Sequence, residues 1–592
     1  MKDAPWLSPA ARARRVGLGV VLLIGALDAW FFQLWNVDPD GVSYVDLALS
    51  FGAHGPGALV NGYWSPLFPA LLGVAYKVVP PTIDTMYRTA HVVSFAVFVV
   101  TTFFFARLLE QLSARVVAFR ESGAAAQVAA VAVAWSAYAL LVLKGLGVRL
   151  VTPDSGVCLV TFWVTGELLA LRDAPWPVSR WLRLGAALGL GYWWKAILFP
   201  AGLVVFGGAA VIALRRRDAR SGPLMGGLVY AAIALALIVP VSSATGRATF
   251  GETGRLNHLW YVENAPYVWD RCRDSRVSDA IAQRFGAIRT DTVLFLDPLT
   301  CVLPEPATEA TQPLWFDPSI WYHGTHSAST LALQWRAIRN NVRFVVEYVS
   351  EAAPVALPAL VIAGLMALAL GGVPRTSWPV AAQLVAPCVL YMVVYVELRH
   401  LSPFLVVAAA VTPLLALRAG PRARPLFWAL AVVVLSDTAV HLSTQTLIEL
   451  TFARNAVRGT LPTRSSDTQR VSRALAAAGL VPGTRVAGIN DLWNPEWAQL
   501  AQLRIRAEIP EFVISMAAIE RALRDPCTEA EWSRILRLSG IVAAVAKIPT
   551  GMPVPPHFVQ ASGEYYVLRL EAVPACAQPA NASRSSSMDA LR

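Results

Sequence analysis

Apolar segments long enough to cross a membrane recur along this chain, and they limit its possible folds more than any other feature. An α-helix of about 20 apolar residues spans the hydrocarbon core of a bilayer. Only 15% of the residues are charged and 56% are hydrophobic, whereas soluble domains carry about 25% charged residues. The chain is therefore predicted to be a polytopic α-helical membrane protein.

Eleven spanning helices are predicted. The stretch 184–214 is too long for one helix and is divided near Lys195 and Pro200, because proline ends or bends a helix. The first apolar segment ends in Trp, Asn and Asp without a small-residue cleavage site, so no cleaved signal peptide is expected. The predicted spans are residues 16–36, 88–110, 123–143, 155–171, 184–196, 198–214, 223–243, 352–371, 378–396, 402–417 and 426–443.

The distribution of basic residues predicts the orientation. With the N-terminus in the cytoplasm, most basic residues between spans face inward, as the positive-inside rule requires. Residues 66–80 are then a helix on the outer face, because a further span there would reverse the bias. The inward set is Lys2, Arg12, Arg14, Arg15, Arg115, Arg120, Arg172, Arg180, Arg183, Arg215, Arg216, Arg217, Arg220, Arg375, Arg418, Arg422 and Arg424, and the outward set is Lys77, Lys144, Arg149, Lys195 and Arg399.

Three hydrophilic segments are predicted to lie outside, at 37–87, 244–351 and 444–592. The transmembrane domain thus covers 1–443, with 37–87 and 244–351 as its outward loops. The second segment is rich in tryptophan, which suits either the membrane interface or stacking on sugar rings. The tail 444–592 is predicted to be a small periplasmic α/β domain with strands at 484–489, 505–509 and 541–546, helices at 495–503 and 517–538, and a disordered end at 581–592.

Charge and cysteine content exclude some functions and leave one question open. The formal charge of +11 lies in short runs between spans, where it sets topology, so nucleic-acid binding is not predicted. No phosphate-binding glycine loop and no metal-ligand spacing are present, so neither a cofactor nor a metal is expected. Cys272 with Cys301, and Cys527 with Cys576, share outward segments, and both pairs are left open as disulfides.

Two carboxylates, Asp38 and Asp40, follow the first span at the membrane surface, where a lipid-linked substrate presents its headgroup. They act either as catalytic acids or as residues that end the helix and turn the chain. Outward basic residues beside hydrocarbon need a partner. Lys195, Arg399 and Arg149 either bind phosphate through charge-assisted hydrogen bonds or extend to lipid headgroups.

In their order along the chain, several short motifs resemble those of the GT-C glycosyltransferases, in the branch of protein O-mannosyltransferases and lipid A aminoarabinose transferases. The resemblance covers residues 1–443. The motifs are Asp38-Pro39-Asp40 with Tyr44 and Ala48, Tyr63-Trp64-Ser65-Pro66-Leu67-Phe68-Pro69, Pro153-Asp154, Lys195 before Pro200, and Glu397-Leu398-Arg399-His400-Leu401-Ser402-Pro403.

The resemblance implies a catalytic base at Asp40, with Asp38 as the substitute. It implies donor-phosphate binding by Lys195 and Arg399, to which His400 and Arg149 are added. His400 stands where an aromatic residue is commoner, and Trp64-Ser65-Pro66 replaces the Lys-Pro-Pro of the family. Tyr44, Trp64 and Asp154 are the candidate substrate-binding residues.

The function implied is inverting sugar transfer from a polyprenyl-phosphate donor to a hydroxyl on a lipid, glycan or protein, at the outer face of the bacterial cytoplasmic membrane. The expected partners are this donor, membrane lipids and the acceptor. Two alternatives remain: a lipid-linked sugar flippase or other transporter, and a polysaccharide polymerase or ligase that uses a diphosphate-linked donor. A transporter is expected to show mid-membrane charges and inverted repeats, whereas the charges here cluster at helix ends.

Overall fold

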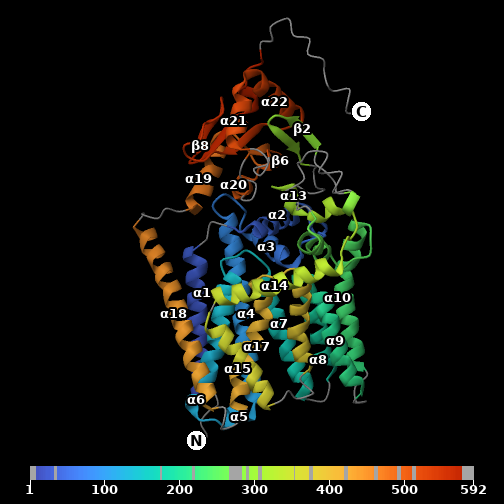
Figure 1. Cartoon of the computed structure of the whole chain (residues 1–592), viewed down its shortest axis with the longest axis vertical. Helices are drawn as coiled ribbons and strands as arrows, with labels where there is room; N and C mark the ends of the chain where they lie inside the picture. Colours follow the sequence, from blue (N-terminus) through green and yellow to red (C-terminus); the bar gives the residue numbers. More distant parts are fainter. Residues whose placement is uncertain are drawn as a thin grey trace. The chain divides into compact units, whose positions relative to one another are not determined.

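A computed structural model describes residues 8–32, 37–173, 177–215, 221–265, 283–287, 292–303, 310–352, 354–371, 378–418, 424–458, 464–489, 495–509 and 515–576. The chain divides into two compact units (Figure 1). The helical unit comprises Met1–Tyr267, Ala280–Arg289 and Asp317–Ser465, and the sheet unit comprises Val268–Asp279, Thr290–Phe316 and Ser466–Arg592.

The helical unit is built mainly of long apolar helices. Its elements are α1 (Pro9–Leu27), the π-helix η2 (Asp28–Phe32), α2 (Pro39–His54), η3 (Pro56–Leu59), α3 (Leu67–Val78), α4 (Met86–Arg115), α5 (Val117–Glu121), α6 (Ala124–Tyr138), the π-helix η4 (Ala139–Gly147), α7 (Asp154–Asp173), α8 (Val178–Trp194), α9 (Leu198–Arg215), α10 (Ser221–Thr245), α11 (Thr253–Asn257), the π-helix η5 (His258–Val262), β1 (Gly286–Ala287), η7 (Pro318–Tyr322), β4 (Gly324–Thr325), α14 (Leu331–Ala352), α15 (Ala356–Gly371), α16 (Trp378–Val394), α17 (Leu398–Arg418) and α18 (Arg424–Val457).

The prediction of a multi-pass helical membrane protein is confirmed. In the described ranges, seven helices are long and apolar enough to cross a membrane, and three shorter apolar helices accompany them. The number of spans stays a prediction. The seven are Met86–Arg115, Ala124–Gly147, Asp154–Asp173, Leu198–Arg215, Ser221–Thr245, Leu398–Arg418 and Arg424–Ile448, and the shorter ones are Leu67–Val78, Ala356–Met366 and Val380–Val394.

The predicted break in 184–214 is confirmed, because α8 ends at Trp194 and Lys195 has an extended backbone. The helix predicted on 66–80 is also present as α3, which at 12 residues is about 18 Å long and too short to span a bilayer. Several helices extend beyond the predicted spans. α1 begins at Pro9, not residue 16, and α4 ends at Arg115, not residue 110. α17 begins at Leu398, not residue 402, and α18 continues past residue 443 to Val457.

Glycines let two of the bundle helices pack backbone against backbone. A methyl group added at Gly185 of α8 would collide with the carbonyl oxygen of Gly226 in α10. Small residues allow such close approach in membranes, where the hydrophobic effect does not drive helices together. In Figure 1, α14 runs across the direction of these bundle helices.

The sheet unit has seven strands in the order β2-β3-β6-β5-β7-β9-β8, in which β5 pairs in parallel with β6 and β7. The predicted α/β tail and its three strands are confirmed. Its elements are β2 (Thr292–Leu296), β3 (Leu299–Val302), α13 (Pro313–Phe316), α19 (Arg464–Ala477), β5 (Arg485–Ile489), α20 (Glu496–Leu500), β6 (Arg504–Ile509), α21 (Met516–Arg524), α22 (Pro526–Leu538), β7 (Ala543–Lys547), β8 (Val559–Ser562), β9 (Tyr565–Arg569) and η10 (Leu570–Ala572).

Three further features of the sheet unit extend or refine the predictions. β2 and β3 come from the second outward segment and join the tail's sheet through β6. The helix predicted at 517–538 is divided because Asp525 caps a new helix whose first residue is Pro526. Cys527 and Cys576 form a disulfide. Cys272 and residues 581–592 lie outside the described residues.

Candidate functional site

The site begins at the capped N-terminus of α2. The Asp38 carboxylate accepts a hydrogen bond from the Gly41 amide at 3.3 Å and another from the Val151 amide at 3.1 Å. Pro39 occupies the first helical position, where a missing N–H costs nothing. Asp38 thus starts α2 and ties it to the turn before α7, and it places Asp40 in the first turn of the helix.

Asp40 forms an ion pair with Arg399, which also pairs with a second carboxylate. The Nη2 atom of Arg399 lies 2.8 Å from Oδ2 of Asp40, and its Nε lies 2.5 Å from Oε2 of Glu397. The Tyr395 hydroxyl donates to Glu397. The side chains of Arg399 and Asp40 remain 22% and 24% exposed, so a substrate group can reach both.

Lys195 and Asp154 form the second ion pair. The Nζ of Lys195 lies 2.6 Å from Oδ1 of Asp154, and the Thr152 hydroxyl donates to Oδ2 at 3.1 Å. Asp154 is nearly inaccessible at 4%, whereas Lys195 is 23% exposed. Arg399 lies close enough for its charge to act on Asp154. The two pairs therefore belong to one cluster. Lys195 is the accessible member of its pair, whereas Arg399 and Asp40 are about equally accessible.

The two acids of the first segment differ in their surroundings. Burial and the negative charge of Asp40 raise the pKa of Asp38 while Arg399 lowers it, and the resulting pKa is about 6. Burial also raises the pKa of the Tyr44 phenol, with the charges of Asp40 and Asp154 adding to it. Both carboxylate oxygens of Asp38 already accept backbone amides, whereas Asp40 is held by Arg399 through Oδ2, so Asp40 is the better placed of the two to accept a proton.

Aromatic rings form one side of this cluster. Tyr44 packs edge-on against Trp64 at a centroid distance of 5.1 Å and against Phe68 at 5.6 Å. Tyr395, two residues before Glu397 in the chain, stacks on Tyr261 with centroids 3.8 Å apart. The predicted substrate residues Tyr44 and Trp64 are thus brought together, and both are buried.

The remaining predicted residues lie in two different surroundings. His400 is buried, its ring stacks on Tyr391 at 4.6 Å, and its Nδ1 accepts the Glu397 amide at 3.2 Å. Nε2 is then the protonated nitrogen and the one left for a ligand. Arg149 is exposed on the turn before α7, two residues from Val151, whose amide binds Asp38.

Glu397 was not among the predicted site residues. Its position two residues before Arg399, at the end of an apolar segment, is visible in the sequence, but its contact with Arg399 is not. With Glu397 included, four carboxylates accompany two cations in the cluster: Asp38, Asp40, Asp154 and Glu397 with Lys195 and Arg399. Over the described ranges, no three His, Cys, Asp or Glu side chains are grouped as a metal site.

No protein-family model and no curated protein matches this chain. Among solved structures, ArnT from Cupriavidus metallidurans bound to undecaprenyl phosphate is similar with a TM-score of 0.48 and 13% identity, over 95% of this chain and 99% of that one. The Archaeoglobus fulgidus oligosaccharyltransferase has a TM-score of 0.48 and 13% identity, over 92% and 70%. The arabinosyltransferase EmbB from Mycobacterium smegmatis has 0.40 and 12%, over 91% and 45%.

These three proteins belong to the GT-C superfamily, the class that the sequence motifs resemble. Because their TM-scores are below 0.5, the function of this chain is argued from its own side chains.

Proposed function

We propose that this protein transfers a sugar from a polyprenyl-phosphate donor to an acceptor hydroxyl, with inversion, at the outer face of the cytoplasmic membrane. The single observation that supports this most strongly is the Asp40–Arg399 pair at 2.8 Å. It combines a carboxylate able to accept a proton with a cation able to hold a leaving phosphate. Lys195 adds a second accessible cation in the same cluster.

In the proposed step, Asp40 accepts the proton of the acceptor hydroxyl, and the hydroxyl oxygen bonds to the anomeric carbon. The bond from that carbon to the phosphate oxygen breaks, and its electron pair leaves with the polyprenyl phosphate. A base must be within hydrogen-bond reach of the proton it takes. Arg399 and Lys195 stabilise the charge that grows on the phosphate, which is a large contribution in a site shielded from water.

The two ion pairs are the resting state of this mechanism. Donor phosphate competes with Asp40 for Arg399 and with Asp154 for Lys195, because phosphate oxygens and carboxylates bind the same donors. Release from Arg399 makes Asp40 a stronger base, since a neighbouring positive charge favours the carboxylate form. Donor binding thus prepares the base, and Glu397 keeps Arg399 in position through its second contact at 2.5 Å.

The test is transfer by the purified full-length protein in nanodiscs, with a panel of polyprenyl-phosphate sugars and a cell-envelope extract as the acceptor source. Asp40→Asn is expected to lower the rate about 10²–10⁴-fold, the usual contribution of a positioned base. Asp84→Asn is the matched control, because Asp84 is an exposed carboxylate on the same segment 37–87.

Transfer by Asp40→Asn within a few-fold of wild type would contradict the assignment of the base. Absence of transfer with every donor, together with movement of a labelled lipid across vesicles that contain the protein, would favour the transporter. Transfer only from diphosphate-linked oligosaccharides would favour the polymerase or ligase.

A further inference from the structure

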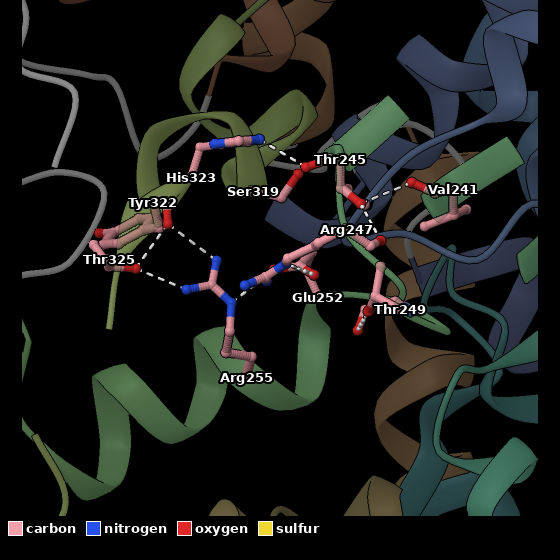
Figure 2. A network of polar contacts seen from close by, with 12 residues as sticks. Val241, Thr245, Arg247, Thr249, Glu252, Arg255, Ser319, Tyr322, His323 and Thr325 are labelled. Carbon is pink, nitrogen blue, oxygen red and sulfur yellow. Dashed lines mark hydrogen bonds and ion pairs between the residues drawn. The ribbon is translucent and has the colours of Figure 1, made fainter. Parts of the chain in front are cut away.

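A second polar cavity lies in the helical unit, among residues that the proposed transfer step does not use. Its volume is about 370 Å³, and Arg247, Glu252, Arg255 and His323 are part of its lining. Figure 2 shows the two arginines on either side of Glu252. This volume falls within the range of about 300–1,000 Å³ that small-molecule sites occupy.

The charges around this cavity are unequal. Glu252 receives Nε of Arg247 on Oε1 at 3.0 Å and Nε of Arg255 on Oε2 at 2.7 Å. Only 2% of the Glu252 side chain is exposed, whereas Arg247 is 36% and Arg255 26% exposed. Two cations therefore share one buried anion, and the two arginine side chains are far more exposed than the glutamate side chain.

The second acid in the lining, Asp317, is bound by other groups. Its carboxylate accepts the Gly62 amide at 3.0 Å, the Ser319 amide at 3.1 Å and the Ser319 hydroxyl at 2.6 Å. Burial lowers the pKa of Arg247, and the like charge of Arg255 lowers it further. An anion in the cavity would relieve this repulsion, because an opposite charge favours the ionised form.

The cavity also offers groups that suit a sugar. His323 Nε2 donates to the Thr245 carbonyl at 2.7 Å, which leaves Nδ1 as the ring nitrogen for a ligand. Arg247 approaches Glu252 through Nε and Nη2, so Nη1 is the part of its guanidinium that this pair does not use. Figure 2 shows the ring of His323 directed toward Thr245.

One short segment connects this cavity to the candidate active site. The Gly62 carbonyl accepts the Glu252 amide at 2.7 Å, and the Gly62 amide donates to Asp317. Two residues later, Trp64 packs on Tyr44 of α2. A ligand held by the arginines is therefore adjacent to the segment that contacts the helix of Asp40.

We propose that this cavity, the Arg247–Arg255 pocket, binds the phosphate or carboxylate group of an anionic saccharide that serves as the acceptor. The assignment as acceptor rests on the proposed transferase function, whereas the anion site itself stands on the geometry of the pocket. Guanidinium groups bind phosphates and carboxylates through paired hydrogen bonds, and the neighbouring polar groups position the sugar hydroxyls.

The test measures binding of glucose 1-phosphate, glucuronate and glucose to the full-length Asp40→Asn protein, which binds without turnover. Both anions are expected to bind more tightly than glucose, and their ratio tells phosphate from carboxylate. Arg247→Gln is expected to weaken both anions about tenfold or more. Ala244→Phe, which fills the pocket and leaves the Arg–Glu pairs intact, has the same expected result.

Arg534→Gln is the matched control, because Arg534 forms an exposed pair with Glu531 at 2.7 Å and is expected to change nothing. In transfer assays on otherwise wild-type protein, Arg247→Gln is expected to raise KM for the acceptor about tenfold, with KM for the donor unchanged.

Equal binding of glucose and the anions, or anion affinity that survives both Arg247→Gln and Ala244→Phe, would overturn the pocket. A rise in the donor KM instead of the acceptor KM would overturn its assignment to the acceptor. Anion binding that depends on Arg247 in a protein without transfer activity would support the pocket and refute only the transferase.

Discussion

The candidate active site and the Arg247–Arg255 pocket pair their charges in opposite ways. In the active site, Arg399 lies between Asp40 and Glu397, and Lys195 pairs with the buried Asp154. In the pocket, two arginines share Glu252. Two carboxylates on one arginine provide groups able to accept a proton, whereas two arginines on one carboxylate favour the binding of a further anion.

The difference indicates a division of roles. Cations that already bind carboxylates exchange these partners for phosphate during a reaction, because the competing interactions are similar in strength. Arginines with too few carboxylates bind an anion without giving up a partner. The active site is thus suited to a transient charge, and the pocket is suited to a persistent one.

The largest effect is expected from removing the cation that Asp40 and Glu397 share in the active site. Arg399→Gln is expected to lower the transfer rate about 10²–10³-fold, the usual cost of losing one stabilising group for developing charge. Steady-state kinetics with the donor varied would measure it. Arg343→Gln is the control, because Arg343 is 80% exposed and pairs with Glu347. Rates within a few-fold of wild type would exclude a role for Arg399 in catalysis.

The second ion pair predicts a stability effect. Lys195→Met leaves Asp154 buried without its cation, which is expected to lower the free energy of unfolding by about 3 kcal/mol. Thermal unfolding in nanodiscs would measure the change. The double variant Lys195→Met with Asp154→Asn removes the unpaired charge and is expected to recover most of the loss. A double variant less stable than Lys195→Met would show that the unpaired charge of Asp154 does not cause the loss of stability.

Removing the shared carboxylate of the pocket is expected to strengthen anion binding rather than to weaken it. Glu252→Gln removes the only carboxylate that the two arginines share, so affinity for glucose 1-phosphate is expected to rise about three- to tenfold. Isothermal titration calorimetry would measure this, with Glu531→Gln as the control at the exposed pair. Unchanged or weaker binding would mean that Glu252 positions the arginines rather than competing with the ligand.

A pH-dependent effect on stability is expected from Asp38, whose folded-state pKa of about 6 exceeds its ordinary value of 3.8. Between these values the folded state binds a proton that the unfolded state has lost, so this residue's contribution to stability falls as pH rises. Above pH 6 the Asp38 carboxylate is ionised in the folded state, and its full destabilising contribution to the free energy of unfolding is present. Asp38→Asn removes that cost while keeping a capping side chain.

Asn has one acceptor oxygen where Asp38 uses two, which adds an offset that does not depend on pH. The melting temperature of Asp38→Asn relative to wild type is therefore expected to rise progressively from pH 4 to pH 6 and then to keep a constant difference. Melting curves across pH 4–8 would measure this, and Asp84→Asn should give no pH-dependent difference. A gain that shrinks between pH 4 and pH 6 would have the wrong sign.

Much of the architecture could be predicted because it depends on local patterns. Apolar length indicated the spans, and Pro200 with Lys195 indicated the break between α8 and α9. Alternation of apolar residues indicated β5, β6 and β7. Strands β2 and β3 were not predicted to join that sheet, because strand pairing between distant segments leaves no local periodicity.

The candidate site could likewise be predicted only in part. Asp40, Lys195 and Arg399 were selected individually, from charge beside apolar segments and from the motif resemblance. Their pairing was not predictable, since Asp40 and Arg399 are 359 positions apart. Glu397 was overlooked because nothing local shows that Arg399 bridges two acids.

The sequence by itself determined that this is a multi-pass helical membrane protein with an α/β tail, and it placed the helix-end residues from which the site is built. These properties depend on the length and period of apolar segments, because these local features decide whether a segment spans the bilayer or packs in the core. Only the tertiary structure decided which charges meet, at Asp40 with Arg399, at Lys195 with Asp154 and at Glu252 with its two arginines. Packing sets these pairings, because an ion pair forms wherever the folded chain brings opposite charges within a few ångströms.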